Sequence, residues 1–294
     1  MNTLASRVAL VAEHTDPRGR ALAVGRSLIA AGGLVVLLFS PDTALFDDLV
    51  WPPDGMRCSG VRAAALWCLA GSSDHGLLLS RVISIAVLLL VLSGFSPRWT
   101  CIPHWYVAFS LGVSSTTANG GESVAQIATV LLIPICLGDS RLWQWTSPTS
   151  PLPPAWRGSA AAALLATRGQ LVVIYLTAVV SKLMDPFWRN GTALRNVAAD
   201  PLFGFPHAVR QLLQPLFDAP PLLAAATWSV IGVQMLVVAG IVAPGRGRAR
   251  IALVLGVCLH LAIGVLMNLL SFGLIMIGLL VIGLVPIRSR PPGT

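Results

Sequence analysis

Residues 250–287 read RIALVLGVCLHLAIGVLMNLLSFGLIMIGLLVIGLVPI, which is two apolar runs separated by almost nothing. Arg250 is the only charged residue in this stretch. A helix needs about 20 mostly apolar residues to cross a bilayer, and each run supplies nearly that length. The stretch therefore predicts two membrane-spanning helices, over residues 250–268 and 270–287, joined by a tight hairpin.

The same pattern recurs along the rest of the chain. Six further apolar runs occupy residues 21–39, 77–95, 104–118, 122–138, 159–183 and 221–243. Of the 294 residues, 55% are hydrophobic and 11% are charged, whereas soluble domains carry about a quarter charged residues. This composition excludes a disordered chain and argues against a water-soluble enzyme. We expect an all-α polytopic membrane helical bundle of about eight transmembrane helices, forming one domain over residues 1–294.

The arginines indicate how the bundle is oriented, because Lys and Arg collect in cytoplasmic loops. The chain carries 19 arginines, one lysine and a formal net charge of +8. With the N-terminus inside, eleven loop arginines fall on the cytoplasmic side and five on the outer side. We expect a multi-pass protein of the cell membrane with both termini cytoplasmic and with extracytoplasmic loops at 40–76 and 184–220. The basic charge then reflects the bilayer as partner, and no nucleic acid is expected.

One run carries polar residues on a single face. Arg168, Tyr175 and Lys182 are spaced by seven, which at about 100° per residue keeps them on one stripe of a helix. Lipid exposure of an arginine in mid-span is costly, so the stripe should face other helices or a wet cavity. Lys182 is either a snorkelling interfacial cation or a group that must lose its proton. The chain uses arginine for every other side-chain cation, which favours the second reading, since an ammonium loses its proton more readily than a guanidinium.

Residues 168–194, RGQLVVIYLTAVVSKLMDPFWRNGTAL, resemble a stretch of vitamin K-dependent γ-carboxylase and of the bacterial HTTM (horizontally transferred transmembrane) proteins. The resemblance implies that Lys182 is a catalytic base and that a quinone or quinol is the cofactor. It also implies that Arg168, Tyr175 and Trp188 line or support a cavity beside it. The shared pattern consists of Arg168-Gly169-Gln170, Tyr175, Ser181-Lys182-Leu183, Trp188 and Gly191.

Residues 16–46, 97–110 and 119–126 are similar to the sporulation-delaying protein B family within the HTTM proteins. That resemblance implies a part in producing a secreted peptide toxin, with the peptide or its precursor and a small accessory protein as partners. The 294 residues hold no counterpart of the carboxylase's large extracytoplasmic domain, and Asn119, Gly120, Gly121 and Glu122 stand near the place of its second essential residue, a histidine. Quinol-linked base chemistry and a non-catalytic role in binding, export or immunity therefore both stay open.

Three further polar residues lie within or beside apolar runs. His260 fits a core residue that is hydrogen-bonded to a neighbouring helix, or alternatively a proton relay or cavity wall. His104 stands beside tryptophans and is expected in an interfacial aromatic belt. Glu122 fits either a first-turn acid favoured by the helix dipole, or a cavity-lining counter-ion or base that faces Lys182.

Cys58 and Cys68 lie ten residues apart in the first outer loop, where an oxidising compartment favours a disulfide. The alternatives are two free thiols or a redox pair that acts on a substrate peptide.

Arg26 and Arg81 lie near span ends and are expected to snorkel to the interface. No histidine pair has metal-ligand spacing, so no protein-bound metal is expected. The chain contains no phosphate-binding, serine-hydrolase or HExxH motif, which argues against energy-driven transport and classical hydrolysis.

Overall fold

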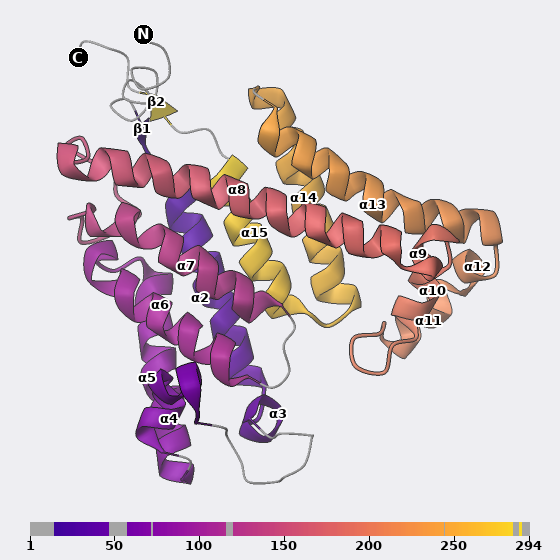
Figure 1. Ribbon diagram of the computed structural model, residues 1–294, viewed down its shortest axis with the longest axis horizontal. Coiled ribbons are helices and arrows are strands. Elements are labelled where there is room, and N and C mark those ends of the chain that lie inside the picture. The colour runs from indigo at the N-terminus through magenta and orange to yellow at the C-terminus, as the bar shows by residue number, and fades with distance from the viewer. Residues whose placement is uncertain are drawn as a thin grey trace.

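The computed structural model describes residues 15–46, 58–71, 73–115, 120–243, 245–284 and 288–289. Apart from one pair of two-residue strands, the regular structure of these residues is helical (Figure 1). The elements in chain order are β1 (Thr15–Asp16), α2 (Arg20–Phe39), α3 (Asp42–Phe46), η1 (Gly60–Ala64), α4 (Leu66–Ala70), α5 (Asp74–Ser93), α6 (Pro97–Ser114), α7 (Gly121–Leu137), α8 (Pro154–Met184), α9 (Pro186–Arg189), α10 (Ala193–Ala198), α11 (His207–Leu212), α12 (Gln214–Phe217), α13 (Pro220–Val242), α14 (Arg246–Leu266), α15 (Leu270–Leu284) and β2 (Arg288–Ser289).

Each of the eight predicted apolar runs coincides with one long helix, namely α2, α5, α6, α7, α8, α13, α14 or α15. Within the described part of the chain, five of these helices, α2, α5, α8, α13 and α14, are long and apolar enough to cross a membrane. Helices α7 and α15 are apolar but have only 17 and 15 residues, and α6 contains Pro103. The all-α class is confirmed, whereas the count of eight spans stays a prediction.

Helix boundaries follow local signals in the sequence. Helix α5 begins after Ser73, whose hydroxyl accepts a hydrogen bond from the Gly76 N–H. It ends at Gly94, which adopts a φ of 85° that favours glycine. Helix α6 begins at Pro97, well before the predicted 104–118 run, because proline suits the first position of a helix.

Helix α15 lies in the interior of the bundle beside α2 and α14, and most of its residues are buried (Figure 1). Helices α2 and α15 approach each other at glycines. A Cβ atom on Gly25 would lie 2.3 Å from Ile282 Cγ1 and 2.7 Å from the Gly278 carbonyl oxygen. Small residues allow such backbone-level contact, and close packing drives helix association in membranes. This pair forms the frame against which α6, α7, α8 and α14 place the candidate site residues.

The described residues between α2 and α5, 40–46 and 58–71, pack against the ends of both helices. The fully buried ring of Trp67 lies 5.3 Å, centroid to centroid, from that of Phe46. Arg81 donates hydrogen bonds to two carbonyls at the C-terminal end of α2 and pairs with Asp42 at 2.6 Å. Arg81 was expected to snorkel; instead it satisfies carbonyls that the end of α2 leaves without intrahelical partners.

The segment between α8 and α13 folds into four short helices beyond the C-terminal end of α8 (Figure 1). Its small apolar cluster contains Ala198, Phe217 and Leu223. The Thr227 hydroxyl on α13 donates to the Gly191 carbonyl at 3.0 Å, which fastens the segment to the long helix.

The strands β1 and β2 bring together two segments from opposite ends of the chain. They pair antiparallel, with Thr15 opposite Ser289. Arg18 pairs with the Asp16 carboxylate at 2.7 Å. Burial raises the pKa of Asp16, but the hydrogen bonds from Arg18 outweigh burial and hold that pKa below its usual value. The pairing places these two segments together, as an even number of spans would allow, while the number of spans and the side of the membrane that the strands face stay predictions.

Candidate functional site

The three residues of the polar stripe on α8, Arg168, Tyr175 and Lys182, lie in three different environments. The Arg168 Nε donates a hydrogen bond of 2.8 Å to the Gly283 carbonyl at the end of α15. Tyr175 is 1% exposed, whereas Lys182 in the last turn of the helix is half-buried. The stripe therefore faces other helices along most of its length, as its spacing predicts, but its three members share no single contact.

Tyr175 and His260 form a buried polar pair between α8 and α14. The Tyr175 hydroxyl and the His260 Nε2 lie 2.8 Å apart, at hydrogen-bond distance. The Phe272 ring packs edge-on against the imidazole, 5.4 Å between centroids. Among the described residues, His260 Nδ1 has no hydrogen-bond partner. His260 is thus hydrogen-bonded to a neighbouring helix, and a role as proton relay stays a prediction.

Lys182 lies against an aromatic ring at the junction of α8 and α9. Its Nζ donates a hydrogen bond of 3.4 Å to the Ala178 carbonyl and lies 5.1 Å from the centroid of the Trp188 ring. Trp188 is held there because the Asp185 carboxylate accepts a hydrogen bond from the Phe187 N–H at the start of α9. The geometry thus brings together Lys182 and Trp188, two members of the shared pattern.

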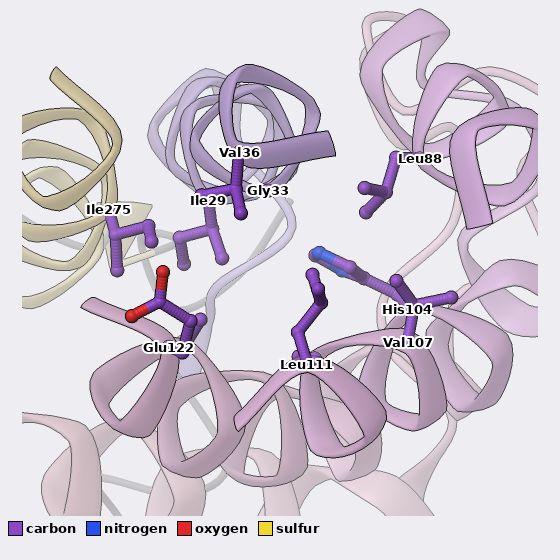
Figure 2. Close-up of a pocket in the computed structure, with 11 residues that line it drawn as sticks. Ile29, Gly33, Val36, Leu88, His104, Val107, Leu111, Glu122 and Ile275 are labelled. Carbon is purple, nitrogen blue, oxygen red and sulfur yellow. The ribbon is translucent and has the colours of Figure 1, made fainter. Parts of the chain in front are cut away.

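Glu122 lines a separate cavity elsewhere in the bundle. It follows Gly120, which has a φ of 80°, in the first turn of α7, and it is 7% exposed. Glu122 and His104 both line a cavity between α2, α5, α6, α7 and α15 (Figure 2). No residue of α8 lines this cavity. The structure therefore groups Glu122 with His104 and gives no contact between Glu122 and Lys182.

The size of this cavity limits what it can hold. Its volume is about 20 Å³, and a buried water needs roughly 10–15 Å³ on the same measure. The space suits a water molecule and is far too small for a quinone ring. The remaining lining is apolar, with Ile29, Leu111 and Ile275 among the walls (Figure 2).

The prediction that His104 lies in an interfacial belt is wrong, because its side chain is 3% exposed and lines the cavity. A signal for this was present in the sequence. Thr100, Cys101, His104, Val107 and Leu111 recur at helical spacing, and all five are buried on one face of α6. The neighbouring tryptophans instead favoured an interfacial position for His104.

Arg26 is also buried, at 1% exposure, so its predicted snorkelling is wrong. Its Nη1 donates to Gln144 Oε1 at 2.7 Å, and its Nη2 donates to Thr100 Oγ1 at 3.2 Å. Gln144 in turn donates to Ser27 Oγ at 3.1 Å. The segment between α7 and α8 thus sends one side chain back into the bundle, which apolar periodicity cannot reveal.

Comparison with known proteins places the chain in a family. No family model and no solved structure matches the chain. The chain is 31% identical to the sporulation-delaying protein SdpB of Bacillus subtilis (strain 168) over 275 residues, which cover 93% of this chain and 84% of that protein. The chain belongs to the SdpB family. It is also 32% identical to the uncharacterized protein YitO of the same organism over 278 residues, which cover 94% of this chain and 89% of YitO.

Family membership covers nearly the whole length of this SdpB-family chain and confirms the predicted resemblance to sporulation-delaying protein B. The further link to HTTM proteins and to vitamin K-dependent γ-carboxylase stays a prediction. The role of Lys182 as a base depends on that further link.

The cysteines of this SdpB-family chain fall into two classes. Cys58 and Cys68 are joined by a disulfide bond, with their Cα atoms 5.5 Å apart. Cys101 and Cys136 are free and buried, and Cys258 is free and exposed. Across the described ranges, no three His, Cys, Asp or Glu side chains are arranged to hold a metal ion.

Proposed function

We propose that this SdpB-family chain is a multi-pass protein of the cell membrane that takes part in producing a secreted peptide toxin. The observation that carries the proposal is the similarity to a sporulation-delaying protein along 93% of the chain. Eight apolar helices and the pairing of β1 with β2 support a bundle with both termini on one side. The single domain, cytoplasmic termini and outer segments 40–76 and 184–220 are part of this proposal.

Within that function, we propose that Lys182 acts as a base in quinol-linked chemistry. The surroundings of Lys182 fit such a ligand, because Trp188 offers an aromatic face and Phe187 and Met184 are exposed apolar side chains at the same helix junction. Lys182 and Trp188 would hold the ring, and the bound quinol would supply reducing equivalents. Lys182 Nζ would take up the proton, while Arg168 and Tyr175 hold α8 against α15 and α14.

The peptide and its accessory protein would meet this site from the outer face. The segment 184–220 follows Lys182 directly and packs on α13 through Gly191. A peptide bound to that segment would lie close to the amine. The small accessory protein is proposed on the family resemblance alone.

The second candidate is a non-catalytic partner of the toxin, acting in binding, export or immunity. The observation that favours it is the contact between the Lys182 ammonium and the Trp188 ring. A cation over an aromatic ring stabilises structure by itself, and arginine makes the same contact. The lysine would then be an anchor for α9 rather than a base.

Lys182→Arg separates the two candidates. The gene that encodes the chain is deleted from toxin-producing cells. A copy that encodes the wild-type chain, Lys182→Arg or Arg189→Lys is then introduced. The Arg189 variant is a matched control because it swaps the other basic side chain of the same junction. Secreted toxin is measured by mass spectrometry and by killing of sensitive cells. We expect Arg189→Lys to restore production and Lys182→Arg to abolish it while the protein accumulates normally.

Each outcome has a definite meaning. Full production with arginine at position 182 rejects the base and leaves the non-catalytic role. Unchanged production in the deletion strain rejects the whole proposed function. Peptide of unaltered mass that fails to leave the cell favours export over chemistry.

A further inference from the structure

His104 and Glu122 are the two ionisable groups that line the cavity between α2, α5, α6, α7 and α15. His104 is 3% exposed and Glu122 is 7% exposed, so both polar groups are removed from bulk water. Figure 2 shows the imidazole and the carboxylate on opposite sides of the lining, with Ile29 and Leu111 between them and the carboxylate turned toward Ile275. Buried ionisable groups inside a membrane bundle are costly, and they commonly mark a proton or ion path.

The chemistry of the two groups is complementary. At neutral pH an imidazole can accept or donate a proton, and a carboxylate can accept one. The cavity of about 20 Å³ has room for water, and a trapped water needs two to four polar partners, of which these side chains supply the first two. We propose that His104 and Glu122 form a proton-binding site inside the bundle, linked by water held in the cavity between them.

Among the described residues, the charge that acts on His104 is that of Arg26 on α2, which opposes a positive charge on the imidazole. The hydrogen bonds of Arg26 go to the uncharged Gln144 and Thr100. Among the residues that line the cavity, α5 contributes only Leu88 and α15 only Ile275, both apolar. On α6, Cys101 lies one turn before His104 and is a free thiol. A proton that enters the cavity is therefore held more readily by the carboxylate than by the imidazole.

This site is independent of the chemistry proposed at Lys182, because no residue of α8 lines the cavity. It also cannot be the site of a quinol, since the ring does not fit. The ligand class is a proton carried by water. Its test uses spectroscopy of the purified chain and does not depend on toxin production.

The sequence allows a sharp experiment. Glu13 and Glu122 are the only glutamates of the chain, so in a Glu13→Gln background an isotope label at the glutamate side-chain carboxyl carbon reports Glu122 alone. The full-length protein is reconstituted in lipid bilayers, and the labelled carbon is followed by solid-state NMR as pH is changed. The matched pair is His104→Gln and His207→Gln, since His207 is exposed at the start of α11.

We expect the midpoint of the Glu122 titration to move by about one pH unit or more in His104→Gln, the size that defines coupled groups. The His207→Gln control should leave it unchanged. An unchanged midpoint in His104→Gln overturns the proposal. If that variant does not fold, a second measurement on the Glu13→Gln protein, in which the cavity is unaltered, still tests the proposal. Magnetisation should pass from water to the labelled carbon of Glu122, and the absence of this transfer overturns the proposal as well.

Discussion

Tyr175→Phe removes one hydroxyl from the interior of the bundle and leaves the imidazole of His260 without its partner. The two atoms are 2.8 Å apart, and the side chains are 1% and 4% exposed, so water cannot replace the lost hydrogen bond. A buried group left without a partner costs about 1–3 kcal/mol. Hydrogen bonds between membrane helices average about 0.6 kcal/mol and reach about 1.7. We expect a loss of about 1.5 kcal/mol in the free energy of unfolding.

The chain provides its own control for this loss. Tyr106 is the only other tyrosine, and its hydroxyl donates to the Ala64 carbonyl at the same distance of 2.8 Å, but from an exposed position. Tyr106→Phe should cost less than about 0.5 kcal/mol, as surface changes usually do. The two hydrogen bonds thus differ in burial and not in length.

Reversible unfolding in detergent micelles, followed by helical circular dichroism, measures both variants. A double-mutant cycle with His260→Leu should give a coupling energy of about 1 kcal/mol, since the two side chains are in contact. The reasoning is refuted if Tyr175→Phe costs no more than Tyr106→Phe, or if the cycle is additive.

Three other changes test the packing and the ends of the bundle. Gly25→Ala should cost about 1–3 kcal/mol by overpacking, because its Cβ would lie 2.3 Å from a side chain of α15, whereas Gly232→Ala has no atom within 4 Å and should be neutral or stabilising in the same unfolding assay. Cys58→Ser, which opens the disulfide to Cys68, should lower stability by about 2–3 kcal/mol, and a reductant should have no further effect on the variant. Asp16 has a lowered folded pKa, so its stabilising contribution is complete above its unfolded pKa of about 3.9 and is lost as pH falls through the folded value. Asp16→Asn should remove that part of the acid sensitivity in unfolding curves measured at several pH values.

Apolar length was sufficient to predict the long helices. Each run of about 20 apolar residues became a helix, because a chain in lipid must satisfy its backbone groups internally. Boundaries at capping residues were less well predicted: the turn of helix that Pro97 starts carries Arg98 and Trp99, so it does not extend the apolar run. The short helices between α8 and α13 have too few residues to show a period.

The polar interior was harder to predict, because a side chain's surroundings depend on which helices meet. Arg26 lies within two turns of the start of α2 and by position suits the interface, yet Gln144 from a distant loop holds it inside. Tyr175 and His260 are 85 residues apart, and each is flanked by apolar residues that gave no sign of the other. Lys182 and Trp188 belong to one short stretch of sequence, so their contact does not depend on which distant helices meet.

Helix α15 contacts α2, α7, α8, α13 and α14, all of which the ribosome makes before it. Until α15 is inserted, the earlier helices enclose a trough lined by the glycines of α2 rather than a finished core. The interior of the bundle is therefore completed only after the last of these helices has been made. An intermediate without α15 would leave the face of α2 that α15 covers open to chaperones and membrane proteases.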